Sequence, residues 1–139
     1  MNRLYLNRVY LAGAMDRVPD GGVQWRQQIT PWLNSRGIIV FDPTNKPCDI
    51  GIENAESRKY RHEAKARGEL GPLLADKEVR TVDLRMVDIT DFTIVNIDLN
   101  SHPCGTYEET FWGNREKKPI LVHCEQGKYG APDWLYWTF

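Results

Sequence analysis

Apolar and polar positions alternate in a regular way over the first third of the chain. Residues 8–12 are mostly apolar and predict a β-strand, which the glycines and Pro19 of residues 13–22 end in a loop. Residues 23–36 have helical periodicity, with apolar side chains on one side at Trp25, Ile29, Trp32 and Leu33. Pro31 interrupts this pattern, so we expect a kink, or two short helices of which Thr30 caps the second.

A second strand follows this helical segment. Gly37 is expected to end the helix, and residues 38–41 predict a buried strand closed by Asp42 and Pro43. A strand, a helix and a strand in this order imply a parallel pair joined by a right-handed crossover. The highly charged segment 44–71 is the least regular part, and residues 54–68 predict an exposed helix or an ordered loop. Such a segment can cover an active site as a lid, but a solvated charged face is commoner.

Residues 79–90 predict a helix with a carboxylate on its apolar side. With Val79 at 0° and about 100° per residue, Asp83 falls at about 40°, within the apolar stripe, whereas Asp88 falls at about 180°. A carboxylate on a core-facing stripe must be hydrogen-bonded, paired or directed into a cavity, because burying it alone is costly. Asp83 is therefore either a buried cap for a neighbouring element or an acid in a cleft.

Residues 91–122 carry the densest candidate chemistry. An apolar strand over residues 92–97 runs into a loop with Asp98, and a Gly-Thr-Tyr-Glu-Glu turn over 105–109 opens a short aromatic helix. Residues 119–123 predict a further strand. In α/β proteins ligands bind at the carboxyl ends of the strands, so the adjacent glutamates of this turn are candidate site residues.

The two glutamates also have a structural explanation. Thr106 and Glu109 have the Thr-x-x-Glu spacing of a helix capping box, which alone would account for both residues. On a helical wheel Glu108 lies nearer the aromatic side chains than Glu109 does, so periodicity does not choose between them. One of the two glutamates is a pocket residue, or Glu109 is only a cap.

These elements predict a three-layer α/β fold of the flavodoxin-like kind, a parallel sheet of four or five strands with helices on both faces, in one domain over residues 1–139.

The net charge of −1 argues against nucleic-acid binding. No apolar run is long enough to span a membrane and no signal peptide is visible, so we expect a cytoplasmic protein. Cys48, Cys104 and Cys124 show no CxxC spacing, which disfavours both a disulfide framework and a metal site.

Several motifs, in order, resemble those of the nucleoside 2-deoxyribosyltransferases and their relatives, the 2′-deoxynucleoside 5′-phosphate N-glycosidases. They are the Tyr-Leu-Ala-Gly of residues 10–13, the Asp83-to-Asp91 spacing, the strand after it, the turn 105–109, and Lys118-Pro119. The resemblance covers residues 8 to 123, with 44–71 unmatched. It implies the flavodoxin-like fold and glycosyl transfer or hydrolysis through a glycosyl-enzyme intermediate, without metal or organic cofactor.

The resemblance also assigns catalytic residues. The family's nucleophilic glutamate comes four residues after a glycine, which matches Glu109 after Gly105. The family's aspartate lies eight residues before the acid that precedes the third strand, which matches Asp83. Tyr10 matches a strand-end tyrosine that holds the nucleophile. Many transferases have a second aspartate shortly before the glycine, but Pro103 and Cys104 occupy these positions in this sequence. The resemblance therefore does not decide whether the protein is a transferase or a hydrolase.

The expected substrate is a 2′-deoxynucleoside or its 5′-monophosphate. Arg17 and Arg26 follow the first strand, where an arginine can clamp a phosphate, although solvated arginines are commoner. The expected substrate-binding residues are Gly13, Asp16, Arg17, Arg26, Asp98, Gly105 and Thr106. The apolar tail 134–139 and the family's shared sites predict a homo-oligomer. A non-catalytic nucleotide-binding or regulatory module on the same fold is the alternative function.

Overall fold

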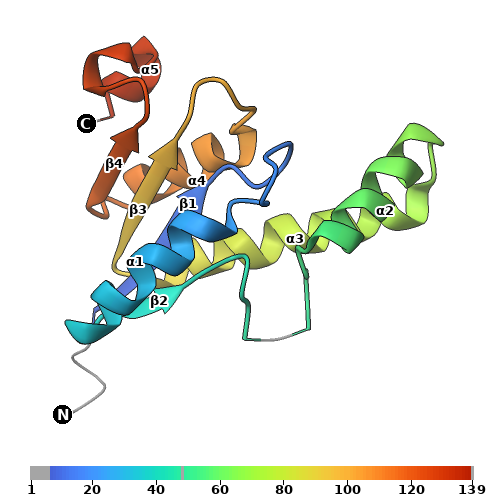
Figure 1. Ribbon diagram of the computed structural model, residues 1–139, viewed down its shortest axis with the longest axis horizontal. Coiled ribbons are helices and arrows are strands. Elements are labelled where there is room, and N and C mark those ends of the chain that lie inside the picture. The colour runs from blue at the N-terminus through green and yellow to red at the C-terminus, as the bar shows by residue number, and fades with distance from the viewer. Residues whose placement is uncertain (1–6, 48, 139) are drawn as a thin grey trace.

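Four short parallel strands form the centre of the protein (Figure 1). The computed structural model describes residues 7–47 and 49–138, so Cys48 and the last residue of the apolar tail lie outside the described residues. The strands follow the order β2-β1-β3-β4 across the sheet. Their bounds are Arg8–Gly13 for β1, Ile39–Phe41 for β2, Phe92–Ile97 for β3 and Ile120–Cys124 for β4. The predicted parallel sheet is confirmed.

The helices cover both faces of this sheet, as predicted for a three-layer flavodoxin-like fold. Helix α1, Val23–Ser35, packs Leu33 against Val9 and Leu11 on one face. Helices α3, Leu70–Ile89, and α4, Cys104–Arg115, lie on the other face (Figure 1). The core on that side includes Tyr10, Ala12, Met86, Val87, Val95 and Ile97. Alternate residues of β1 therefore serve two separate apolar layers.

The register brings the strand ends that carry candidate residues to one edge. Gly13 at the end of β1 pairs with Asn96 of β3, and Ile97 pairs with Cys124 of β4. Gly13 allows this edge to close, because a Cβ there would lie 2.8 Å from Cζ2 of Trp25 and 3.2 Å from the Asn96 carbonyl. The loops after β1, β3 and β4 thus emerge together.

Helix α1 corrects the expectation of two short helices. It runs unbroken over residues 23–35 with Pro31 inside, and Thr30 is an interior residue whose hydroxyl donates to the Arg26 carbonyl at 2.7 Å. Pro31 is exposed, so the carbonyl that loses its amide partner can bond to water. The helix begins after Gly22, at φ 77°, and ends before Gly37, at φ 73°, as the sequence predicts.

Strand β2 corrects another expectation. The sequence predicts a buried strand, but β2 lies at the edge of the sheet and Ile39 is 38% exposed. An apolar run in the sequence indicates a buried strand in general, but it does not show whether the strand lies at the edge or in the centre of the sheet.

The charged middle of the chain forms a helical hairpin that projects beyond the sheet (Figure 1). Helix α2, Ala55–Ala66, is capped by Asn54, whose side chain accepts from the Ser57 amide while the Ser57 hydroxyl accepts from the Asn54 amide. The exposed helix expected there is confirmed. The helix expected over 79–90 is the second half of α3, which starts nine residues earlier than the apolar stripe indicates.

The C-terminal segment packs partly on its own domain. Lys128–Gly130 forms a 3-10 turn, and the short helix α5, Asp133–Tyr136, inserts Leu135 into the core beside Cys124. Trp134 and Trp137 remain 71% and 70% exposed. No helix within residues 7–47 and 49–138 has both the length and the apolar character that a membrane span requires.

Candidate active site

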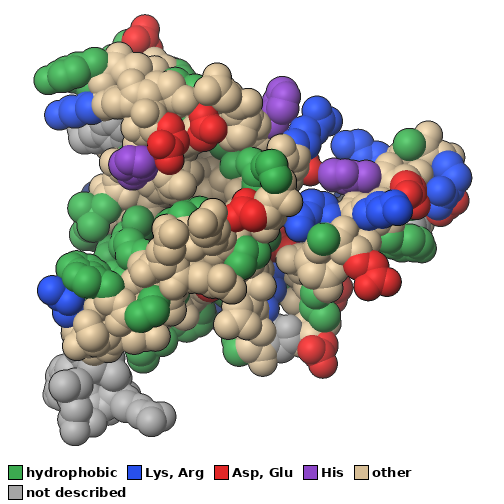
Figure 2. Space-filling model, viewed as in Figure 1, with side chains coloured by type: hydrophobic (Ala, Val, Ile, Leu, Met, Phe, Trp, Pro, Cys, Tyr) green, Lys and Arg blue, Asp and Glu red, His purple; other side chains and the backbone are tan. Residues whose placement is uncertain are grey.

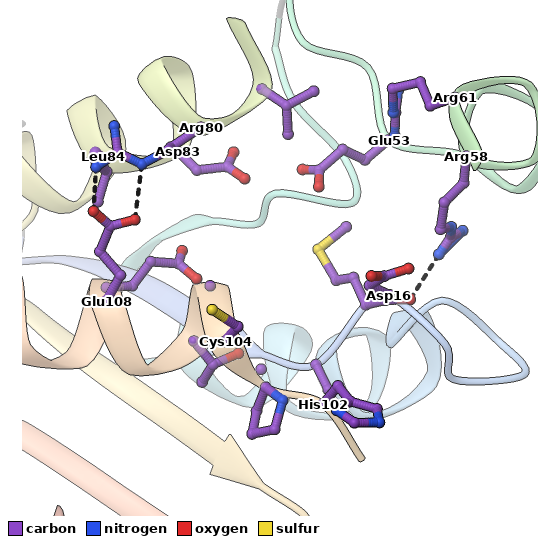
Figure 3. Close-up of a pocket in the computed structure, with 18 of the residues that line it drawn as sticks. Asp16, Glu53, Arg58, Arg61, Arg80, Asp83, Leu84, His102, Cys104 and Glu108 are labelled. Carbon is purple, nitrogen blue, oxygen red and sulfur yellow. Dashed lines mark hydrogen bonds and ion pairs between the residues drawn. The ribbon is translucent and has the colours of Figure 1, made fainter. Parts of the chain in front are cut away.

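A cavity of about 510 Å³ opens at the carboxyl ends of β1 and β3, where the sequence places the site. Its walls come from the loop after β1, the start of α4, the second half of α3 and one side of α2 (Figure 3). Six of the predicted residues line it: Gly13, Asp16, Asp83, Gly105, Thr106 and Glu109. A volume of this size is typical of pockets for small-molecule ligands.

Glu109 lines this cavity, and Tyr10 lies next to Glu109 without being a lining residue itself. Tyr10 is fully buried on β1, and Glu109 is a half-buried residue of α4 whose Oε2 is shut off from solvent. The two groups are close enough for Tyr10 to lower the pKa of Glu109. The phenol oxygen and Oε2 nevertheless each lack a hydrogen bond of standard geometry within the described residues. Two such buried polar atoms side by side are costly, which is typical of a functional site.

Burial dominates the electrostatics of both groups. Desolvation raises the pKa of Glu109 to about 7, against the opposing effects of Tyr10 and of the Arg26 charge. Burial, followed by the charges of Glu109 and Asp83, raises the pKa of Tyr10 well above its ordinary value. Tyr10 is therefore a neutral phenol at physiological pH, able to donate a hydrogen bond but not to act as a base.

The expected capping box is wrong. Helix α4 begins at Cys104, its N-terminal flanking residue is Pro103, and no side chain caps it. Thr106 lies inside the helix, 3% exposed, and its carbonyl accepts the Thr110 hydroxyl at 2.6 Å. Glu109 consequently lies in the second turn of α4 and has no capping role, so the explanation of Glu109 as a cap is excluded.

The structure distinguishes the two adjacent glutamates. Glu108 lies on the cavity's outer side and forms an ion pair with Arg80 of α3, with its Oε2 2.9 Å from Nε of Arg80 (Figure 3). Glu109 points inward to Tyr10 instead. Both residues line the cavity, but only Glu109 has a carboxylate oxygen that is buried without a partner in the described part of the chain.

Asp83 belongs to a compact charged cluster. Its Oδ1 lies 2.9 Å from Nζ of Lys46, which also lies 2.8 Å from Oε2 of Glu53. Burial, followed by the charge of Glu53, raises the pKa of Asp83 to about 8, while Lys46 opposes this effect. Asp83 and Glu53 project into the same part of the cavity from α3 and from the segment before α2 (Figure 3). Asp83 is thus a cleft carboxylate and not a cap.

Arg26, Arg17 and Asp98 are not among the residues that line the cavity. The Arg26 guanidinium is fully buried and donates to the carbonyls of Leu11, Gly13 and Gly22 at 2.7–3.2 Å, so it holds the loop after β1 in place. Arg17 is exposed in that loop.

Asp98 has a structural contact of its own. It accepts from Gln126 Nε2 at 2.8 Å and so joins the loops after β3 and β4.

Basic side chains from α2 form the outer wall. Arg58, Arg61, His62 and Lys65 line the cavity, and Figure 2 shows the positive and histidine side chains gathered over this helix. Nη1 of Arg58 donates to the Met15 carbonyl at 2.8 Å, and Nε2 of His62 lies 2.8 Å from Oδ1 of Asp16. These contacts tie α2 to the loop after β1. The charged segment is therefore part of the cavity wall as well as a solvated face.

Sequence analysis missed Lys46, Glu53 and the basic face of α2. The one usable signal was the density of charge in residues 44–71, but no spacing rule connects Lys46 or Glu53 to Asp83, which is 30 or more positions further along the chain.

Within the described residues, no three His, Cys, Asp or Glu side chains are arranged to hold a metal ion. Cys104 and Cys124 are free thiols.

Comparison with solved structures shows that the fold is similar to those of two 2-deoxyribosyltransferases. The enzyme from Leishmania mexicana matches with a TM-score of 0.56 and 16% identity, over 85% of this chain and 64% of its own length. The enzyme from Bacillus psychrosaccharolyticus matches with a TM-score of 0.57 and 18% identity, over 93% of this chain and 79% of its own. No protein-family model and no curated protein matches the sequence. The chain therefore has the fold of 2-deoxyribosyltransferases, and spans less than two thirds of the Leishmania protein.

Proposed function

We propose that the protein cleaves or transfers the N-glycosidic bond of a 2′-deoxynucleoside or its 5′-monophosphate, with Glu109 as the nucleophile. The observation that carries the proposal is the Glu109 carboxylate, buried beside Tyr10 and opening onto the same cavity as Asp83. Cleavage with a glycosyl-enzyme intermediate uses two carboxyl groups in one site, and Glu109 and Asp83 line the same cavity.

The reaction follows from these protonation states. The Glu109 carboxylate attacks C1′ of the sugar, the bond from C1′ to the base nitrogen breaks, and its electron pair leaves with the base. Asp83 in its acid form donates the proton that the base takes up. Water or a second base then attacks C1′ on the glycosyl-enzyme, gives its proton to the Asp83 carboxylate, and releases Glu109. Two displacements give retention at C1′.

The pKa values define a pH window for this reaction. Glu109 must be ionised, so activity should rise as pH increases through about 7. Asp83 must be protonated, so activity should fall as pH increases beyond about 8. We therefore expect a narrow bell-shaped profile of kcat/KM with its maximum between these values. Since the two groups share one cavity, the limbs report the pair together.

The basic wall of α2 supports the 5′-monophosphate as the preferred substrate. Arg58, Arg61, His62 and Lys65 face a cavity whose inner end is acidic, an arrangement that suits a ligand with a neutral sugar and an anionic end. Lys65→Gln should raise KM for the monophosphate and leave KM for the nucleoside unchanged. Lys59→Gln is the matched control, because Lys59 lies on the same helix but is exposed and does not line the cavity.

A panel experiment tests the proposed function. Deoxynucleosides and their 5′-monophosphates are incubated with the purified protein, with and without a different free base, and the products are separated by chromatography. Free base indicates hydrolysis, and a nucleoside with the exchanged base indicates transfer. Absence of turnover across the panel, together with measurable binding, would contradict the proposal and favour the non-catalytic nucleotide-binding module.

We also propose that the protein forms a homo-oligomer through its exposed aromatic surface. Trp134, Trp137 and Tyr129 are 70–87% exposed around α5, and exposed aromatic side chains gathered in one place are typical of an interaction surface. Light scattering at micromolar concentration should give at least the mass of a dimer, and a monomer mass of 16.1 kDa would contradict this.

A further inference from the structure

A carboxylate–ammonium–carboxylate cluster borders the cavity, with Glu53 and Asp83 in the cavity lining and Lys46 behind them, and the proposed reaction does not explain it. The Lys46 side chain is 3% exposed, and its Nζ lies 2.8 Å from Glu53, 2.9 Å from Asp83, and within hydrogen-bonding reach of the Gly51 carbonyl. The Glu53 and Asp83 side chains are 14% and 13% exposed. Lys46 and Glu53 belong to the segment between β2 and α2, for which the glycosyltransferase motifs offer no counterpart.

The charges of this cluster do not balance when all three groups are ionised. One ammonium between two carboxylates leaves a net charge of −1 in a poorly solvated place, and two like charges that share a site favour retention of one proton. Lys46 contacts both carboxylates, so the position of the proton depends on the other surroundings of each. Nζ of Lys46 donates a hydrogen bond to Oε2 of Glu53, whereas the buried Oδ1 of Asp83 lies in ion-pair range of Nζ but lacks a hydrogen bond of standard geometry within the described residues. The cluster therefore favours the proton on Asp83.

We propose that Glu53 and Lys46 are positioning residues that keep the proton on Asp83 until the leaving base takes it. Glu53 makes ionisation of Asp83 unfavourable, and Lys46 limits this effect so that Asp83 can still release its proton. The inference rests on the proposed function, because it assigns the origin of the acid form of Asp83 that the reaction uses. It gives the segment between β2 and α2 a part in the reaction that acts through Asp83.

The other charged groups around Asp83 come from every element that borders it. Tyr10 of β1 and Glu109 of α4 lie on its inner side, and Arg80 of α3 is engaged by Glu108 of α4. The basic residues of α2 that line the opposite wall are Arg58, Arg61, His62 and Lys65. Within the described residues, Lys46 is the cation in ion-pair contact with Asp83, which makes Lys46 and Glu53 the groups whose removal should change its titration most.

Two substitutions should shift the alkaline limb of the pH profile in opposite directions. Glu53→Gln removes the repelling charge and leaves Lys46 to pair with Asp83 alone, so the limb should move down by about one pH unit or more. Lys46→Met removes the attracting charge and should move the limb up. Glu53→Asp keeps the carboxylate and should restore the wild-type limb. Glu56→Gln is the matched control, since Glu56 is exposed and lies outside the cavity lining.

A merely structural role would lower kcat without moving the limb, and that result for Glu53→Gln would overturn the inference. Shifts in the same direction for Glu53→Gln and Lys46→Met would also overturn it. Titration of the Asp83 carboxyl carbon by NMR, assigned by its loss in Asp83→Asn, needs no turnover. If the wild-type protein cleaves no glycosidic bond, the proposed function fails on its own. An Asp83 titration unchanged by Glu53→Gln then overturns the inference, and a titration moved to lower pH supports it.

Discussion

The two sides of the cavity hold carboxyl groups with raised pKa values, but they do so with different partners. On the sheet side, Glu109 lies beside the neutral phenol of Tyr10, and the Arg26 charge also lowers the pKa of Glu109. On the side of α3, Asp83 faces the charged pair formed by Lys46 and Glu53. Burial is the largest cause of the shift on both sides.

The two sides differ in whether the partner stabilises or destabilises the ionised carboxylate. A phenol can donate a hydrogen bond to a carboxylate and so favours its ionisation, whereas a neighbouring carboxylate opposes it. The pKa of Glu109 accordingly rises to about 7 and that of Asp83 to about 8. Two buried carboxyl groups in one cavity thus have different partners, and the proposed roles of nucleophile and acid rest on this difference.

Removal of the carboxylate on the sheet side should have the largest effect. Glu109→Ala is expected to lower kcat/KM by a factor of about 10³ or more, because a covalent nucleophile has no substitute in the cavity. Steady-state assays, with circular dichroism to verify folding, measure this. The isosteric Glu109→Gln should be equally inactive, so a cavity defect cannot explain the loss. Near-normal turnover in a folded Glu109→Ala protein would remove Glu109 from the nucleophile role.

Removal of the Asp83 carboxyl group, on the side of α3, should reduce activity less than removal of the Glu109 carboxylate. Asp83→Asn is expected to reduce kcat by a factor of about 10² and to abolish the alkaline limb of the pH profile, since the group that titrates there is gone. Substrates whose base leaves without protonation should lose less. Comparison of several leaving bases across pH 6–9 makes the measurement. An unchanged alkaline limb in this variant would assign the limb to another group.

Tyr10→Phe tests the phenol that distinguishes the two sides. Loss of the hydroxyl removes an effect that lowers the pKa of Glu109, so the acid limb should move to higher pH and kcat/KM at pH 7 should fall roughly tenfold. The alkaline limb should stay nearly unchanged. An acid limb that does not move would mean that Tyr10 only packs the core.

The smallest effect is expected for Glu108, which is adjacent to the proposed nucleophile. Glu108→Ala breaks an exposed ion pair with Arg80 and should change kcat/KM by no more than about threefold, because exposed pairs contribute little. The same assays used for Glu109→Ala measure it, which makes the two neighbours a matched comparison. A hundredfold loss in Glu108→Ala would transfer the nucleophile assignment to Glu108.

Local sequence patterns were sufficient to predict several strands and helix ends and one residue of the cavity. The apolar run of residues 92–97 predicted β3 to the residue, and Gly37 marked the end of α1. The helical wheel selected Asp83 as an acid on an apolar stripe, and the structure places Asp83 in the cavity. These features depend on periodicity and on backbone preferences of single residues, which the order of amino acids expresses directly.

Other features were decided by contacts between distant segments. Thr-x-x-Glu describes a helix cap and a helix interior equally well, and only the start of α4 at Cys104 shows that Glu109 lies inside. Arg26 donates to the carbonyls of Leu11 and Gly13 in β1 and of Gly22 before α1, so the arginine expected at a phosphate supports the backbone instead. Lys46 meets Asp83 because α3 packs against the segment that precedes α2, where a Cβ on Gly51 would lie 3.2 Å from Cα of Val79. The identity of a residue sets what it can bind, while desolvation and neighbouring charge, which decide its proton affinity, come from the tertiary fold.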